Sequence, residues 1–184
     1  RDSLGTQRIP PAAYSGIQTA RAVENFPISG LRLQPEMVRA YAFIKKAAAH
    51  ANRTVKALPA RYASAISRAC DEVLRGKLNE QFVVDVYQAG AGTSYNMNMN
   101  EVVANRANEL LGARKGSYRY VRPNDHVNMA QSTNDTFPTA MRLACLMALP
   151  PLVDGIAQLE GSLRKKARQF DGVVKAGRTH LQDA

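Results

Sequence analysis

Long stretches with helical periodicity, bounded by proline and glycine, occupy most of the chain after residue 34. In the clearest of them, residues 95–111, the apolar side chains Met99, Val103 and Leu110 share one stripe and Gly112 follows. This spacing is typical of an amphipathic α-helix, which glycine commonly terminates. The other predicted helices cover about 35–57, 59–75, 135–149 and the residues from after Pro151 to 170, with a break or kink expected at Pro150-Pro151. The sequence therefore predicts a mainly α fold.

Three segments are less regular. Prolines and glycines divide residues 1–30 into short pieces, so we expect extended chain and turns with one helical turn near residues 19–25. Residues 81–88, QFVVDVYQ, are apolar and β-branched, which favours a short strand or a buried extended piece. Before the helix at 135–149, Asp135 is the candidate N-cap.

The chain is basic, with 25 lysines and arginines, 15 acidic residues and a formal net charge of +10. Such a charge suits nucleic acid or small anions. The basic residues are scattered, however, and no aromatic residues interleave with the densest cluster at 164–168. Because base stacking needs aromatic side chains, we expect a solvated helix face and no nucleic-acid partner.

Cysteines and apolar runs point to a soluble cytoplasmic protein. Cys70 and Cys145 lie far apart, in neither a metal-binding nor a disulfide-dense spacing. The first residues contain no apolar core of a signal peptide. The longest apolar run, residues 144–153, is too short to span a bilayer if the prolines interrupt it. We expect no membrane partner.

Three polar clusters lie beside predicted loops or helix starts. They are Gly92-Thr93-Ser94 with Asn96, Ser132-Thr133-Asn134-Asp135, and Arg178-Thr179-His180. Each could simply cap a helix, but capping needs one side chain and not four in a row. Helix N-termini attract anions, and hydroxyls and amides add directed donors. The clusters therefore predict a site for a carboxylate, including one whose charge grows during a reaction.

The histidines leave two alternatives open. His126 and His180 lie near the polar stretches and could be functional or structural, whereas His50 in mid-helix is expected to be structural. No pair of histidines has metal-ligand spacing, and neither a dinucleotide fingerprint nor a Walker A motif is present. We therefore expect no cofactor and identify no metal ligand.

At these clusters the sequence resembles the aspartase/fumarase superfamily. The matching motifs are GTSYNMNMNEVVANRANELLG (92–112), PNDHVNMAQSTNDTFPTAMRLA (123–144) and GRTHLQDA (177–184). Within the superfamily, DVYQAGAGTSYNMN (85–98) is similar to aspartases, since class II fumarases typically read QTGSGTQ before this run. Residues 14–30 and 44–52 are also similar to aspartases. The alternative is a class II fumarase, in which NMNMNEVVANRA (96–107) and QSTNDTFPTAMRLA (131–144) would also be in place.

The resemblance implies an N-terminal lyase domain, about residues 1–133, and the truncated start of a long central helical bundle, 134–184. It implies a homotetramer that converts L-aspartate to fumarate and ammonia through an enediolate, with no organic cofactor but with divalent-metal activation in some members. The implied substrate-binding residues are Thr93, Ser132, Thr133, Asn134, Thr179 and His180, with His180 also a candidate auxiliary catalytic group.

The family's catalytic base is a serine on a loop with the signature GSSxMPxKxNP. That signature does not occur in these 184 residues, so no catalytic base is identified in them. We expect the 184 residues alone to be inactive while carrying part of the dicarboxylate site.

Overall fold

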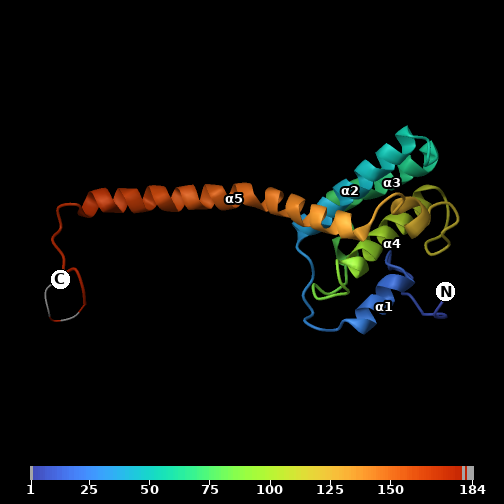
Figure 1. Cartoon of the computed structure of the whole chain (residues 1–184), viewed down its shortest axis with the longest axis horizontal. Coiled ribbons are helices and arrows are strands. Elements are labelled where there is room, and N and C mark those ends of the chain that lie inside the picture. The colour runs from blue at the N-terminus through green and yellow to red at the C-terminus, as the bar shows by residue number, and fades with distance from the viewer. Residues whose placement is uncertain (1, 180, 182–184) are drawn as a thin grey trace. The chain divides into compact units, whose positions relative to one another are not determined.

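The computed structural model describes residues 2–179 and 181, and their regular secondary structure is almost entirely helical. The α-helices are α1 (Ile17–Asn25), α2 (Pro35–Thr54), α3 (Ala60–Leu74), α4 (Thr93–Leu110) and α5 (Thr133–Phe170), with single turns at Asn79–Gln81 and Pro123–Val127 (Figure 1). In this described part, β structure is limited to isolated bridges, Asp2 with Gly5 and Arg32 with Asp85. The predicted mainly α fold is confirmed.

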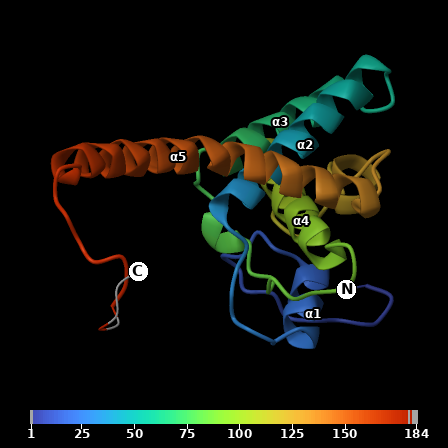
Figure 2. The same ribbon diagram turned by 60° about the vertical axis from the view of Figure 1, so that its left-hand side comes forward.

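Two compact units make up the chain, residues 1–145 and 146–184. The predicted domain boundary at residue 133 coincides with the start of α5 and stays a prediction. Within the first unit, α2 and α3 form a helical pair, α4 packs on α3, and α1 packs on α4 (Figure 2). Ala40 of α2 and Ala69 of α3 are fully buried, and such small side chains suit close helix packing.

Helix ends follow the local signals that predicted them. Pro35 occupies the first turn of α2. Gly76, after α3, and Gly112, after α4, have φ angles of +77° and +82°. Both lie in the left-handed region that glycine adopts without steric cost, so each ends its helix as expected.

The predicted strand at residues 81–88 is not present as a strand. Its backbone makes one isolated bridge, between Asp85 and Arg32. The Asp85 carboxylate instead holds the neighbouring loop by accepting hydrogen bonds from the backbone N–H groups of Ser29 and Gly30 at 2.8 and 2.7 Å. These hydrogen bonds lower the pKa of Asp85 to about 2, against the opposing effect of burial. The segment is therefore the alternative, a buried extended piece.

The predicted break at Pro150-Pro151 is wrong, because α5 runs without interruption from Thr133 to Phe170. Each proline lacks an N–H, which frees the carbonyl oxygens of Leu146 and Met147 four residues earlier. Leu146 and both prolines are exposed, so water can hydrogen-bond the freed groups and the helix continues.

Helix α5 is long and apolar enough to cross a membrane by length and composition alone, with 6% of the relevant window buried. The sequence-based expectation concerned residues 144–153 alone, with a break at the prolines, whereas the helix that contains them is continuous and much longer. Between Met141 and Phe170, which are also exposed, its exposed apolar side chains are Leu146, Leu149, Leu152, Val153, Ile156, Leu159 and Leu163. We call these seven residues the α5 apolar face. So many exposed leucine, isoleucine and valine side chains on one helix are typical of a contact site.

Candidate functional site

The N-termini of α4 and α5 are brought together by the contact of Gly92 with Phe137. Gly92 has φ +81°, and a Cβ added there would lie 2.0 Å from the Phe137 ring. The Phe137 ring in turn lies 6.2 Å from that of Tyr41 on α2. Because only glycine leaves room for this ring, the first turn of α5 reaches the start of α4. The sequence placed Thr93 and Thr133 in separate clusters, and the fold makes the clusters neighbours.

Capping accounts for only part of these clusters. Ser132 caps α5, since its Oγ accepts a hydrogen bond from the Asn134 N–H at 3.3 Å, so the predicted N-cap Asp135 is wrong. At α4 no side chain of Gly92 can cap, and the Tyr95 N–H donates to Gln88 Oε1 at 2.7 Å. Thr93 is therefore not needed as a cap, and its exposed side chain is left for another role.

A buried polar network lies beneath the joined helix starts. Asn96 donates from Nδ2 to Thr133 Oγ1 at 2.9 Å and to Asn128 Oδ1 at 3.1 Å. Asn100 adds a further donation to the same Asn128 oxygen at 3.3 Å. Asn96 and Asn100 are almost fully buried, and Thr133 is half-buried. Asn96 therefore holds the start of α5 directly through Thr133, and Asn100 contributes through Asn128.

Lys45 of α2 is at the base of this network. Its fully buried Nζ donates to Asn96 Oδ1, Asn128 Oδ1 and Gln131 Oε1 at 2.7, 3.0 and 2.9 Å. Burial lowers the pKa of Lys45 to about 7, and the nearby Cys70 side chain opposes that shift. Sequence analysis missed this residue. The sequence feature that could have revealed it is a lysine at a position where the helical pattern predicts a buried side chain.

The third cluster belongs to a different unit of the chain from the other two. Thr179 is exposed and belongs to the unit 146–184, while His180 lies outside the described residues. His126 is half-buried, with Nδ1 accepting from the Arg122 N–H at 2.9 Å and its ring 5.3 Å from that of Tyr62. Burial lowers its pKa. These contacts fit the structural alternative for His126.

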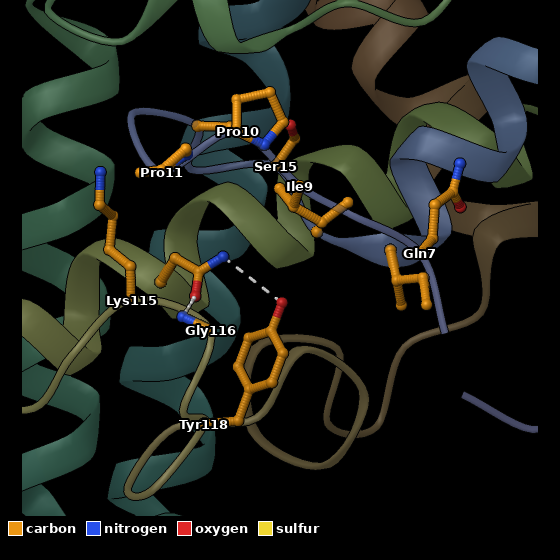
Figure 3. A pocket seen from close by; sticks show the side chains of 12 residues that line it. Gln7, Ile9, Pro10, Pro11, Ser15, Lys115, Gly116 and Tyr118 are labelled. Atoms are coloured by element: carbon orange, nitrogen blue, oxygen red, sulfur yellow. Dashed lines mark hydrogen bonds between the residues drawn. The ribbon is translucent and has the colours of Figure 1, made fainter. Parts of the chain in front are cut away.

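A cavity of about 320 Å³ lies elsewhere in the first unit, between the segment 7–17 and the loop 115–118 (Figure 3). The Tyr118 hydroxyl, which Figure 3 labels, accepts a hydrogen bond from Asn105 Nδ2 at 3.4 Å. Neither Thr93 nor Thr133 lines this cavity. Among the described residues, no group of three or more histidine, cysteine or acidic side chains could hold a metal ion.

Comparison with known proteins decides the family. The sequence model of the lyase family matches residues 5–184, nearly the whole chain. The chain belongs to this lyase family, the aspartase/fumarase superfamily. The superfamily motifs around Thr93, Thr133 and Thr179 all lie inside the matched region.

Superfamily members with two different names resemble the chain. Aspartate ammonia-lyase of a Bacillus species is 53% identical over 184 residues, covering 100% of this chain and 39% of that protein. Class II fumarate hydratase of Halobacterium salinarum is 56% identical over 185 residues, with the same coverage. The chain thus spans about two fifths of the length of these relatives.

Solved structures of the superfamily share the fold. The crystal structure of fumarate lyase:delta crystallin from Brucella melitensis has a TM-score of 0.95 at 54% identity, covering 100% of this chain and 42% of that one. Class II fumarase of Schistosoma mansoni has a TM-score of 0.90 at 41% identity, covering 100% and 39%. Overall identity therefore does not separate the two activities.

Proposed function

We propose that these 184 residues form part of the substrate site of an aspartate ammonia-lyase, which converts L-aspartate to fumarate and ammonia. The observation that carries the proposal is the convergence of Thr93 with Ser132-Thr133-Asn134 at two joined helix N-termini. Hydroxyl, amide and N–H donors at such a place suit a carboxylate. The names of the relatives in the superfamily fit a small dicarboxylate substrate.

The chemistry requires donors where negative charge develops. Removing the Cβ proton of aspartate turns the adjacent carboxylate into an enediolate with additional charge, and expulsion of ammonia then forms the double bond. Thr93, Ser132 and Thr133 would donate hydrogen bonds to this carboxylate, so they bind the enediolate more strongly than the substrate and lower the barrier. Asn134 and His180 would lie near the amino group, and Thr179 near the α-carboxylate. The serine base would come from a loop outside these residues.

Residues around the α4 start favour L-aspartate over malate. Asp85, Tyr87, Gln88 and Ser94 match the aspartase pattern. Two of these side chains have a structural role. The Asp85 carboxylate accepts from the Ser29 N–H and holds that loop, and Gln88 accepts from the Tyr95 N–H in the first turn of α4. A second candidate function, class II fumarate hydratase, is supported by the 56% identity to the Halobacterium salinarum protein.

A cytoplasmic homotetramer completes the proposal. The α5 apolar face would pack against the corresponding helices of three other copies, burying the leucines that are exposed in one chain. The sites would then be assembled from more than one copy. The 184 residues alone would be inactive because the serine loop is not among them.

An ultraviolet assay of fumarate tests the activity. The full protein containing this chain is offered L-aspartate in one reaction and L-malate in another, with the 184-residue chain as control. Fumarate from aspartate alone supports the ammonia-lyase. Fumarate from malate alone would establish the hydratase instead, and turnover by the 184-residue chain would overturn the need for the missing loop.

A further inference from the structure

Lys45 is a buried cation whose hydrogen-bond partners are three side-chain carbonyl oxygens. Its Nζ contacts Asn96, Asn128 and Gln131, and within the described part of the chain no carboxylate forms an ion pair with it. A buried charge with no opposite charge beside it is costly. The arrangement therefore needs an explanation beyond packing.

The direction of each hydrogen bond in this network follows from the chemistry of the ammonium group. The protonated ammonium group is a donor only, and three carbonyl oxygens surround it, so Asn96 must turn its carbonyl oxygen toward protonated Lys45. The Asn96 NH₂ group then faces the other way and donates to Thr133 Oγ1. Because this oxygen acts as an acceptor, the hydrogen of the Thr133 hydroxyl remains to be donated elsewhere. Among the described residues, the Thr133 hydroxyl makes this hydrogen bond and no other.

The same ammonium group also fixes the residues that lead into α5. Gln131 accepts from Lys45 and donates from Nε2 to the backbone oxygen of Val127 at 2.9 Å. Asn128 accepts from Lys45 and donates to the backbone oxygen of Gln131 at 3.1 Å. Lys45 thus determines where α5 begins as well as the orientation of Asn96.

We propose that Lys45 is a positioning residue of the substrate site, which orients Asn96 so that the Thr133 hydroxyl donates its hydrogen to a bound carboxylate. This inference rests on the proposed function, in which Thr133 contacts the dicarboxylate. Without the ammonium group, the Asn96 amide keeps only its donations to Thr133 Oγ1 and to Asn128 Oδ1. The Asn128 oxygen itself accepts from Lys45, so both amides lose that partner and Asn96 can rotate by half a turn to present its oxygen to Thr133. The Thr133 hydroxyl would then donate to Asn96 and be lost to the substrate.

A double-mutant cycle in the full enzyme tests the proposal, with kcat/KM for L-aspartate as the readout. Lys45→Met removes the ammonium group, and Thr133→Val removes the hydroxyl it is proposed to direct. We expect Lys45→Met to lower kcat/KM about tenfold or more in the native background, the value of one hydrogen bond to a charged group. In the Thr133→Val background the same change should cost less than about twofold. Lys46→Met, which removes the next lysine and its 2.6 Å ion pair with Asp71, should leave kcat/KM unchanged.

Asn96→Asp provides an independent test if Lys45→Met does not fold. Aspartate has the same shape and keeps a partner for Lys45, but both of its oxygens accept, so the Thr133 hydroxyl must donate to it. The donation to Asn128 Oδ1 is also lost, with or without Thr133. We expect an enzyme that folds with reduced stability, because an oxygen then faces Asn128 Oδ1, and whose kcat/KM falls about tenfold only when Thr133 is present. An equal loss with and without Thr133 would overturn the positioning role but leave the proposed function standing. Unchanged kinetics in Thr133→Val alone would overturn the proposed function as well.

Discussion

At the scale of single residues, Gly92 determines whether the two polar clusters meet. Its φ of +81° and its contact with Phe137 both require the absence of a Cβ. Gly90, two residues earlier, has φ +45°, but a Cβ added there would have no atom within 4 Å, so it experiences only the first constraint. Comparing substitutions at Gly90 and Gly92 therefore separates the cost of backbone strain from the cost of steric contact with Phe137.

Gly92→Ala should therefore destabilise the protein more than Gly90→Ala does. A left-handed alanine costs about 1–3 kcal/mol at either position. At Gly92, displacement of the Phe137 ring adds roughly 1–3 kcal/mol, because overpacking a dense interior forces neighbours to shift. Urea unfolding of both variants measures the difference. Equal losses of unfolding free energy would show that Phe137 yields easily and that Gly92 does not fix the α4–α5 junction.

Lys45 predicts a pH dependence of stability. Its pKa falls from 10.5 to about 7 on folding because of burial, so between these values the unfolded chain binds more protons. The free energy of unfolding should thus rise with pH above 7, by up to about 1.4 kcal/mol per unit. The effect of Lys45 is best measured between pH 7 and 8.5. At higher pH the Cys70 thiol would also contribute, because burial raises its pKa to about 12 in the folded protein.

Lys45→Met should remove this slope, while Lys46→Met should retain it. Denaturant unfolding at several pH values between 7 and 8.5 measures all three proteins. The same slope in native protein and Lys45→Met would mean that Lys45 is not the titrating group.

At the scale of elements, Glu101 of α4 holds the N-terminus of α1. Its nearly fully buried carboxylate accepts from the backbone N–H groups of Gly16, Gln18 and Thr19 at 2.8, 3.0 and 3.0 Å, and from the Thr19 hydroxyl at 2.6 Å. A carboxylate at a helix N-terminus satisfies donors that the helix cannot satisfy itself. Helix α1 is short, so this interaction anchors it to the core.

Glu101→Gln should loosen α1, because the NH₂ group of glutamine would face the backbone N–H groups that now donate to the carboxylate. We expect a loss of about 2–4 kcal/mol in unfolding free energy and faster amide hydrogen exchange in Ile17–Asn25. Glu24→Gln, on the exposed side of the same helix, keeps an acceptor for Gln7 and should have little effect. Slow exchange of α1 in Glu101→Gln would show that other contacts anchor it.

Local sequence signals predicted most helices, and contacts between distant segments explain the errors. Periodicity with Pro35, Gly76 and Gly112 located α2, α3 and α4, because those signals act within a few residues. The Lys45 network was not predictable, since its partners lie 51 to 86 residues away along the chain. The error at Pro150-Pro151 has another cause: an exposed helix can hydrate the carbonyl groups that proline frees.

At the scale of the whole molecule, the α5 apolar face must be covered. The exposed fractions of Leu152 and Leu159 are both 60%. The 184-residue chain should therefore self-associate through this face, with an association that strengthens as concentration rises. Replacing both leucines by glutamate should give a monomer, whereas Gln158→Glu on the same helix should not. Sedimentation measures the mass, and a native chain that stays monomeric at all concentrations would contradict the prediction.

The most direct test of the central claim is kcat/KM for L-aspartate in the full enzyme carrying Thr133→Val. If Thr133 donates to a carboxylate whose charge grows in the transition state, the variant should lose about a hundredfold or more, mostly in kcat. Thr54→Val, at an exposed threonine near the end of α2, should match the native enzyme. Native kinetics in Thr133→Val would contradict the account that the joined starts of α4 and α5 form the substrate site.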